Sequence, residues 1–241
     1  MNLRDRVERA LAHEVAAISP LSGGCVARVA CADLRGGERV VVKWAVAPGA
    51  RLDVEAFMLR LLGTHLGDLV PRVLHDEDDL LIMSHIPNDG VRSDAGMGAL
   101  GEALGRLHGV GSSAFGLDRD TLIGPLRLPN AWGDAWTDFY GERRLRAMAR
   151  EAHEAGRLEA SDRRRVDRLC ERLGDLLGEE HSPELVHGDL WAGNVLWRQG
   201  SLGGLIDPGC YFGVGEVDLA MMDLFGGFTG AFWERYAEVR G

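Results

Sequence analysis

Residues 187–194, HGDLWAGN, decide the fold of this chain together with residues 205–209, LIDPG. Asp189 and Asn194 stand five positions apart, and Asp207 follows thirteen positions after Asn194. Phosphoryl transfer needs one carboxylate that faces the attacking hydroxyl, and a second carboxylate and an amide oxygen that hold Mg²⁺ against the ATP phosphates. Because Mg²⁺ prefers hard oxygen ligands and keeps several waters, two protein ligands suffice. The spacing predicts a catalytic base at Asp189 and Mg²⁺ ligands at Asn194 and Asp207.

The same interval, D-x-x-x-x-N, occurs in the catalytic loop of protein kinases. A purely structural interpretation is also open, because Asp and Asn often only shape the turn after a strand, and single matches arise by chance. Short apolar strands are expected just before Asp189 and Asp207, and a sheet-rich segment lies upstream. These neighbours favour the phosphotransferase interpretation.

Lys43 is the only lysine in the chain, whereas arginine occurs 26 times. It ends the apolar run VVVK, and Glu55 follows in a segment with helical periodicity. In kinase-type folds, a lysine on the third strand reaches the ATP phosphates and pairs with a glutamate on the next helix. Arginine is not an equivalent substitute, because its planar fork differs in reach from a compact ammonium. We therefore predict a Lys43–Glu55 pair at the nucleotide; the alternative is a chance lysine at a strand end.

Gly23 and Gly24 lie in the segment LSGGC between the first two expected strands, where a loop would cover the phosphates. Two glycines are a weak signal, and a plain hairpin turn explains them equally well. Cys25 would lie near phosphate and positive charge, conditions that favour the thiolate, so we hypothesise that it is sensitive to oxidation.

Hydrophobic periodicity divides the chain into a sheet-rich first part and a helix-rich second part. The first part is expected to contain a helix over residues 3–17, strands around the turn at 35–39, a helix over 51–63 and strands around the acidic turn at 76–79. The second is expected to hold helices over 95–109, 131–152 and 158–178, a loop over 112–130, short strands near 184–190, 194–197 and 203–208, and two helices flanking Gly226-Gly227. The fold class is therefore α+β, with a small antiparallel-sheet lobe at 1–86, a mostly helical lobe at 87–241 and a cleft between them.

A net charge of −10 argues against binding to nucleic acid phosphates and suits a cationic small substrate, although solubility alone explains an acidic surface. The four cysteines form no CxxC pair, so neither a zinc site nor a disulfide framework is indicated. The first residues lack an apolar signal segment, and no apolar run is long enough to cross a bilayer. A cytoplasmic protein without a membrane partner is expected.

Two further polar residues are expected to have structural roles. Asp218 begins an apolar helical segment, so it is predicted to be a helix cap or a buried acceptor for the amides of the catalytic loop. His187 is predicted to shape the loop by hydrogen bonding, because Asp189 already provides a base.

Several segments resemble the fructosamine kinase (ketosamine-3-kinase) family, within the superfamily of aminoglycoside phosphotransferases and protein-kinase-like enzymes. They are LVHGDLWAGNVLW, LIDPGCYFGVGEVDLAMMDLFGGF, FGLDRDTLIGPLRLPNAWGDAWTDFYGERRL, LSGGCVA and VVVKWA, and the resemblance runs from about residue 7 to the end. It implies a protein-kinase-like fold of two lobes. It also implies phosphorylation by Mg-ATP of a sugar hydroxyl on a ketosamine, either a small molecule or a glycated protein lysine, in deglycation repair.

The resemblance assigns further roles to individual residues. The backbone near Met83, His85 and Ile86 would meet adenine, and Trp191 would line the sugar pocket. Trp132 and Trp136 are alternative pocket residues, but we expect them in the core. The sequence departs from the family at Val26-Ala27, and the family has further helices after the position of Gly241, so the second lobe is expected to lack terminal helices.

Two other functions stay open at this point. One is a related phosphotransferase acting on aminoglycosides or choline-like amines, and the other is a catalytically weak nucleotide-binding protein. The sequence carries no expectation about oligomeric state.

Overall fold

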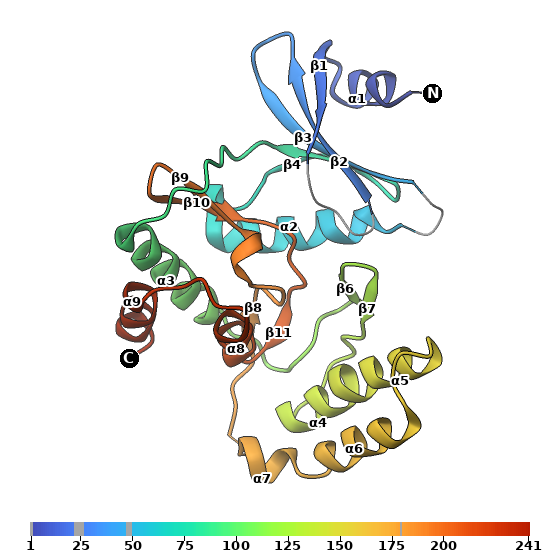
Figure 1. The fold of residues 1–241 in the computed structure, drawn as a ribbon, viewed down its shortest axis with the longest axis vertical. Helices are drawn as coiled ribbons and strands as arrows, with labels where there is room; N and C mark the ends of the chain where they lie inside the picture. Colours follow the sequence, from blue (N-terminus) through green and yellow to red (C-terminus); the bar gives the residue numbers. More distant parts are fainter. Residues whose placement is uncertain (1, 22–26, 47–49, 179) are drawn as a thin grey trace.

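The computed structural model describes residues 2–21, 27–46, 50–178 and 180–241. Its first part is an antiparallel sheet of five strands in the order β1-β2-β3-β5-β4. Figure 1 shows this sheet at the top of the molecule, with helix α2 crossing beneath it. The elements of this part are α1 (Leu3–Leu11), β1 (Val15–Pro20), β2 (Ala27–Leu34), β3 (Arg39–Ala45), α2 (Leu52–Leu66), a 3₁₀ turn (Gly67–Leu69), β4 (Val73–Glu77) and β5 (Leu80–Ser84).

Strand alternation explains how the sheet presents Lys43 to the site. Val40 and Val42 on β3 are fully buried in a cluster with α1, on one face of the sheet. Successive side chains of a strand point to opposite faces, so Val41 and Lys43 point to the other face. That face packs on α2, whose apolar side chains join the main core of the molecule. The sequence pattern of β3 therefore directs its single lysine toward α2.

The first helix is shorter than its hydrophobic period predicts. It is capped by Asn2, whose side chain accepts from the Asp5 amide at 2.9 Å, and it ends before Ala12, which has a left-handed φ of 55°. The expected continuation to residue 17 is wrong, because Val15 begins β1 and pairs with Leu34 of β2. Val15 is buried in the cluster that also contains Val7 of α1. An apolar residue at this position fits either a buried helix face or a buried strand, so the sequence pattern did not distinguish the two.

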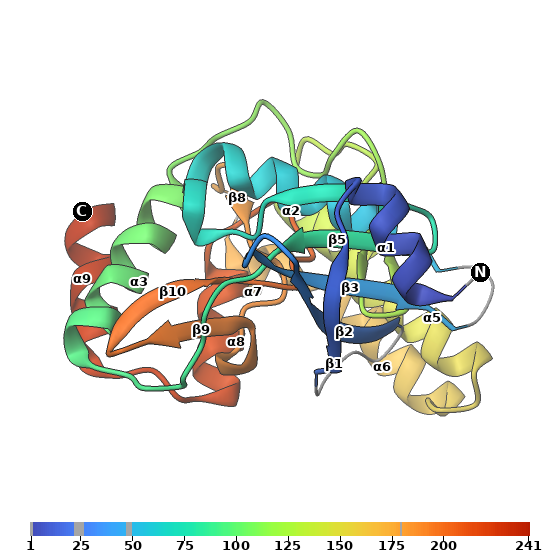
Figure 2. The same cartoon turned by 90° about the horizontal axis from the view of Figure 1, so that it is seen from above.

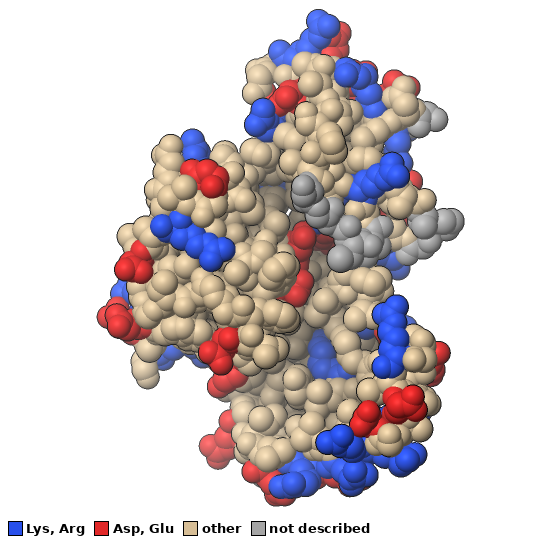
Figure 3. All heavy atoms as spheres, in the orientation of Figure 1, with Lys and Arg blue, Asp and Glu red and all other residues tan. Residues whose placement is uncertain are grey.

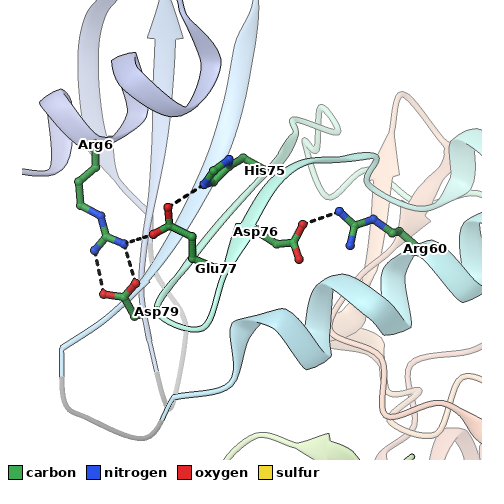
Figure 4. Close-up of polar contacts among 6 residues, drawn as sticks. All are labelled: Arg6, Arg60, His75, Asp76, Glu77 and Asp79. Carbon is green, nitrogen blue, oxygen red and sulfur yellow. Dashed lines mark hydrogen bonds and ion pairs between the residues drawn. The ribbon is translucent and has the colours of Figure 1, made fainter. Parts of the chain in front are cut away.

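Exposed ion pairs connect both helices to the hairpin of β4 and β5, as Figure 4 shows. Arg6 of α1 lies 3.0 Å from Glu77 and 2.6 Å from Asp79, while Arg60 of α2 pairs with Asp76. Such pairs stabilise a fold by only about 0–1 kcal/mol each. They join α1 and α2 to the same hairpin, while the burial of apolar side chains supplies most of the stability.

The second part of the chain is mostly helical (Figures 1 and 2). Helices α3 and α9 lie side by side in both views. The described helices are α3 (Asp94–His108), α4 (Trp136–Tyr140), the π-helix Gly141–Arg146, α5 (Ala147–Glu154), α6 (Ala160–Cys170), α7 (Leu173–Leu177), the 3₁₀ turn Ala192–Asn194, α8 (Glu216–Phe225) and α9 (Gly230–Arg240). None of the helices in the described ranges has the length and apolarity that a membrane crossing requires.

Short strands form three antiparallel pairs in this second part. They are β6 (Thr121–Ile123) with β7 (Leu126–Leu128), β8 (Glu184–Val186) with β11 (Tyr211–Gly213), and β9 (Val195–Arg198) with β10 (Ser201–Leu205). The helices around residues 95–109 and 158–178 and on both sides of Gly226-Gly227 are confirmed, the second of them divided into α6 and α7. The helix expected over 131–152 begins only at Trp136 and continues through the π-helix and α5 to Glu154. The β6–β7 hairpin occupies part of the expected loop at 112–130.

Candidate active site

The ammonium of Lys43 joins two carboxylates that come from distant parts of the chain. Lys43 Nζ lies 2.6 Å from Glu55 Oε1 of α2 and also donates to Asp207 Oδ1, 164 positions away in the sequence. The side chains of Lys43 and Glu55 are only 12% and 16% exposed. The pair predicted from the sequence is therefore formed, and the structure adds Asp207 to it.

The charge of this lysine is well stabilised. Burial by itself lowers the pKa of Lys43, but the Coulombic attraction of Glu55 and Asp207 and their hydrogen bonds outweigh burial and raise this pKa above its ordinary value. Lys43 is consequently a fixed positive charge at the junction of the sheet and the second part of the chain.

Asp207 is held in an unusual backbone conformation. Its φ is 55°, in the left-handed region that non-glycine residues rarely adopt. Two backbone hydrogen bonds connect its loop to residues 187–194, the predicted catalytic loop: the Ile206 amide donates to the Asn194 carbonyl at 3.0 Å, and the Gly209 amide donates to the His187 carbonyl at 2.9 Å. Such strain persists where surrounding contacts over-determine it, and it concentrates at functional sites.

Glycine at position 188 is required by the close approach of these two loops. Gly188 has a φ of +82°, and a Cβ there would lie 2.3 Å from the carbonyl oxygen of Gly209. A larger residue would therefore separate Asp189 from Asp207.

Asp189 and Asn194 form one unit in the catalytic loop. Asn194 Nδ2 donates to the Asp189 carbonyl at 2.7 Å and to Asp189 Oδ2 at 3.1 Å. Both bonds use the amide nitrogen of Asn194, so its oxygen Oδ1 stays available as a ligand. Burial raises the pKa of Asp189, the Asn194 hydrogen bond opposes this shift, and the charge of Asp207 adds to it. Asp189 is thus a more basic carboxylate than an exposed one.

The buried acceptor predicted at Asp218 is confirmed. Asp218 Oδ2 accepts from the His187 amide at 2.7 Å, and Oδ1 accepts from the Gly188 amide at 2.8 Å. The residue is fully buried in the first turn of α8, and the cap position of that helix is Gly215. Asp218 therefore fixes the backbone that leads into Asp189.

Two residues that sequence reasoning missed complete this network. Buried His108, at the end of α3, places Nε2 3.1 Å from Asp218 Oδ2 and Nδ1 2.8 Å from the hydroxyl of Tyr236 on α9. No local pattern marks a lone histidine and a lone tyrosine separated by 128 positions. Burial would penalise an ionised Asp218, but hydrogen bonding from His108 and the loop amides holds its pKa below the ordinary value.

His187 has the structural role predicted for it. It is fully buried, and burial lowers its pKa. The Asp189 amide donates to His187 Nδ1 at 3.3 Å. His187 therefore shapes the backbone around Asp189.

The tryptophans divide between surface and core. Trp191 is 43% exposed beside Phe225, with ring centroids 6.4 Å apart. Trp136 is buried, as expected, in a cluster with Phe115. The expectation of a core position is wrong for Trp132, which is 48% exposed and stacks on Phe212 at 6.4 Å, because its loop lies on the surface of the second part.

The segment expected to meet adenine follows strand β5. The side chain of Met83 is buried and its backbone pairs with Val41 and Val73 in the sheet. His85 and Ile86 follow the strand, and the structure gives their backbone groups no hydrogen bond to described residues. They are therefore the positions of this segment with free donors and acceptors. Gly23, Gly24 and Cys25 lie outside the described residues.

Two hollows lie close to these loops. One of about 350 Å³ is lined by Ile86, Pro87, Arg198, Gln199, Ser201, Leu202 and Gly203. Another, of about 530 Å³, is lined by Arg92, Ser93, Asp94, Met97, Gly227, Phe228 and Thr229. Neither Asp189 nor Asp207 lines these two hollows. Both residues lie where the sheet of the first part meets the second part of the chain, close to Lys43. Figure 3 shows acidic atoms at this junction, in the hollow between the upper and lower parts of the molecule.

The architecture is that of kinase-like phosphotransferases. An aminoglycoside phosphotransferase solved with ADP and hygromycin B superposes with a TM-score of 0.68 at 18% identity, covering 100% of this chain and 83% of that one. A crystal structure of a candidate fructosamine-3-kinase from Thermobifida fusca superposes with a TM-score of 0.90 at 32% identity, covering 99% and 84% of the two chains.

The sequence places the chain within that class. The model of the family described as fructosamine kinase matches residues 4–241, and the chain belongs to this family. A probable ketoamine kinase of Synechocystis is 41% identical over 142 residues, covering 58% of this chain and 47% of the relative. A chloroplastic protein-ribulosamine 3-kinase of Arabidopsis thaliana is 30% identical over 164 residues, covering 66% and 48%. The chain thus aligns with just under half the length of these two relatives.

Proposed function

We propose that this protein transfers the γ-phosphoryl group of ATP to a sugar hydroxyl of a ketosamine, with Asp189 as the catalytic base. The observation that supports this most directly is the convergence of Lys43, Glu55 and Asp207 beside the Asp189–Asn194 unit. These residues would supply what phosphoryl transfer requires, namely a base, a cation for the phosphates and oxygen ligands for a metal.

The donor set at the junction fits Mg²⁺. Asp207 offers a carboxylate that is 43% exposed, and Asn194 presents Oδ1 because its Nδ2 is bound to Asp189. These hard oxygens suit Mg²⁺, which is commonly held by one or two protein ligands plus substrate phosphates. When bound, Mg²⁺ would neutralise charge that develops on the phosphoryl oxygens.

The residues of the chain have separate tasks in this mechanism. Asp189 accepts the proton of the attacking hydroxyl, and its raised pKa makes it a better acceptor. Lys43 binds phosphate oxygens and is held in place by Glu55. Asp218 keeps the loop rigid through the His187 and Gly188 amides, so that the base is positioned before the substrate arrives.

For the nucleotide, we propose that the backbone of His85 and Ile86 binds adenine and that Met83 supports this segment from the sheet. Gly23 and Gly24 would cover the phosphates. We also propose that the boundary between the two lobes falls after Ile86, where β5 has ended.

A ketosamine acceptor is supported by the family and by the surface beside the base. The Arabidopsis relative is named for protein-bound ribulosamine. Exposed Trp191 lies two residues from Asp189 and offers a sugar an apolar face. The acidic atoms at the junction suit the cationic amine of a ketosamine (Figure 3). Both small ketosamines and glycated protein lysines carry this group.

One assay tests the proposal. The protein is incubated with Mg-ATP and, in parallel, ribulose-lysine, fructose-lysine, kanamycin and choline, and phosphorylated products are identified by mass. We expect product from at least one ketosamine and none with Asp189→Asn. Phosphate on kanamycin or choline alone would show that the acceptor is an aminoglycoside or a choline-like amine and not a ketosamine. ATP binding without any product would show that the protein binds nucleotides but does not transfer phosphate.

A further inference from the structure

The β6–β7 hairpin lies between the two elements that carry the carboxylates on Lys43. Thr121 pairs with Leu128 and Ile123 with Leu126, and Figure 1 shows the hairpin directly beneath α2. Leu122 packs against the main core, to which α2 contributes its apolar face. The hairpin belongs to the second part of the chain, yet it contacts the helix of the first part that bears Glu55.

The first contact of the hairpin is with α2 itself. The guanidinium carbon of Arg119, just before β6, lies 4.0 Å from the centroid of the Phe57 ring. Phe57 follows Glu55 by two positions, so the two side chains leave the helix in nearly opposite directions. A rotation of α2 that moved Glu55 away from Lys43 would also draw Phe57 away from Arg119.

The second contact is with the loop of Asp207. A Cβ on Gly209 would lie 2.7 Å from Ile123 Cγ1 and 3.3 Å from the Leu122 carbonyl oxygen, and 3.4 Å from that of Gly188. Gly209 is thus enclosed between the hairpin and the catalytic loop. The hairpin therefore approaches the backbone of Gly209 too closely to leave room for a side chain there.

We propose that the β6–β7 hairpin is a positioning element that fixes α2 relative to residues 207–209, with Arg119 as its main positioning residue on the α2 side. Because Glu55 is on α2 and Asp207 is on that loop, the hairpin determines whether both carboxylates reach Lys43 together. The mechanical link stands on the contacts alone, while its consequence for phosphate binding rests on the proposed function.

The test compares substitutions of two arginines, one just before the hairpin and one in its second strand. Arg119→Ala removes the cation above Phe57, and Arg127→Ala is the matched control, since Arg127 is exposed and pairs with Asp120. We measure the Kd of Mg-ATP well below the unfolding temperature, kcat, and amide hydrogen exchange across α2. For Arg119→Ala we expect faster exchange in α2 and a Kd raised by up to about two- to fivefold, the limit that loss of one exposed cation–π contact sets.

Two further variants separate positioning from general stability. Arg119→Lys keeps a cation above the ring and should recover most of the affinity. Phe57→Leu should reproduce the Arg119→Ala effect, and the double variant should be no weaker than either single one, because both remove the same contact.

The inference is overturned if Arg119→Ala matches Arg127→Ala in both α2 exchange and Mg-ATP affinity. It is also overturned if the effects of Arg119→Ala and Phe57→Leu simply add. If the unaltered protein neither binds Mg-ATP nor transfers phosphate, the proposed function fails, and exchange in α2 still decides whether the hairpin holds the helix.

Discussion

The side-chain amide of Asn194 lies 3.1 Å from the carboxylate of Asp189, the two residues whose spacing first indicated phosphoryl transfer. The same amide also donates to the Asp189 carbonyl at 2.7 Å. One residue of the loop thus fixes the orientation of the other, and neither side chain can turn without loss of a hydrogen bond.

Replacing Asp189 by Asn should lower kcat by about 10²–10⁴-fold, the usual contribution of a general base, with little change in Mg-ATP affinity. Burial raises the pKa of Asp189, so its ionised form opposes folding at neutral pH, and the variant should melt no lower than the original protein. Single-turnover kinetics and thermal unfolding check the two parts. Near-normal turnover would remove Asp189 from the mechanism.

The pH profile should report the environment of Asp189. Protonated Asp189 cannot accept a proton, so kcat/KM should fall on the acid side with an apparent pKa above that of an exposed aspartate. Asn194→Ala removes a hydrogen bond that opposes the shift, so its acid limb should lie at higher pH, whatever the absolute rate. Profiles recorded at saturating Mg-ATP decide this, and a limb that moves to lower pH would contradict it.

Lys43→Arg should raise the KM for ATP and lower kcat, because the wider guanidinium does not fit between Glu55 and Asp207. Arg165→Lys is the control, because it makes the opposite exchange on the exposed face of α6 and should leave both KM and kcat unchanged. Steady-state kinetics of both variants provide the comparison. An active Lys43→Arg enzyme with unchanged KM would show that the single lysine has no special role.

Stability separates the structural role of Lys43 from its catalytic role. Lys43→Met leaves Glu55 as a largely buried carboxylate without its closest cation, which should cost about 3 kcal/mol in the free energy of unfolding. Adding Glu55→Gln should recover much of this loss without recovering activity. Urea unfolding measures both, and a double variant as unstable as the single one would contradict the assigned pairing.

His108 should be replaceable by Gln better than by Asn. Gln places its amide nitrogen where Nε2 meets Asp218, whereas the shorter Asn reaches only the position of Nδ1. A buried acceptor that loses a donor costs about 1–3 kcal/mol, so the Asn variant should unfold more easily. Urea unfolding and kcat of the two variants provide the test, and equal losses would contradict the assigned bond.

Acid should narrow that difference in stability between the Gln and Asn variants. The pKa of Asp218 is held low in the folded state against the effect of burial, so its contribution to stability is present above the unfolded pKa. This contribution is lost as pH falls through the folded pKa. The Asn variant holds the pKa of Asp218 less low and has less of this stability to lose, so the two variants should converge in acid, and a gap that widens would contradict the assigned bond. Unfolding curves recorded between pH 7 and acid conditions follow this loss directly.

Much of the fold was predictable because local pattern and long-range packing agree. Alternation in β3 directs Lys43 toward α2, and the loop at Asp189 follows a short apolar strand. The end of α1 was not predictable, since Val15 is apolar and buried in either conformation.

The missed parts of the site depend on contacts that no local pattern encodes. The network of His108, Asp218 and Tyr236 joins three helices across 110 and 128 positions of sequence. The β6–β7 strands have three residues each, too few to establish a periodicity. Trp132 looked like a core residue because its size and apolarity carry no information about the direction of its loop.

The bond between Tyr236 and His108 has a consequence for the order in which the site is completed during synthesis. The loop of Asp189 is synthesised before α9. The His108 ring that bonds Asp218 is held on its other side by the Tyr236 hydroxyl, and this second bond forms only when α9 has docked against α3. A nascent chain that already contains Lys43, Asp189 and Asp207 therefore still lacks one support of its catalytic loop. The backbone before Asp189 is then fully supported only after α9 has docked onto α3.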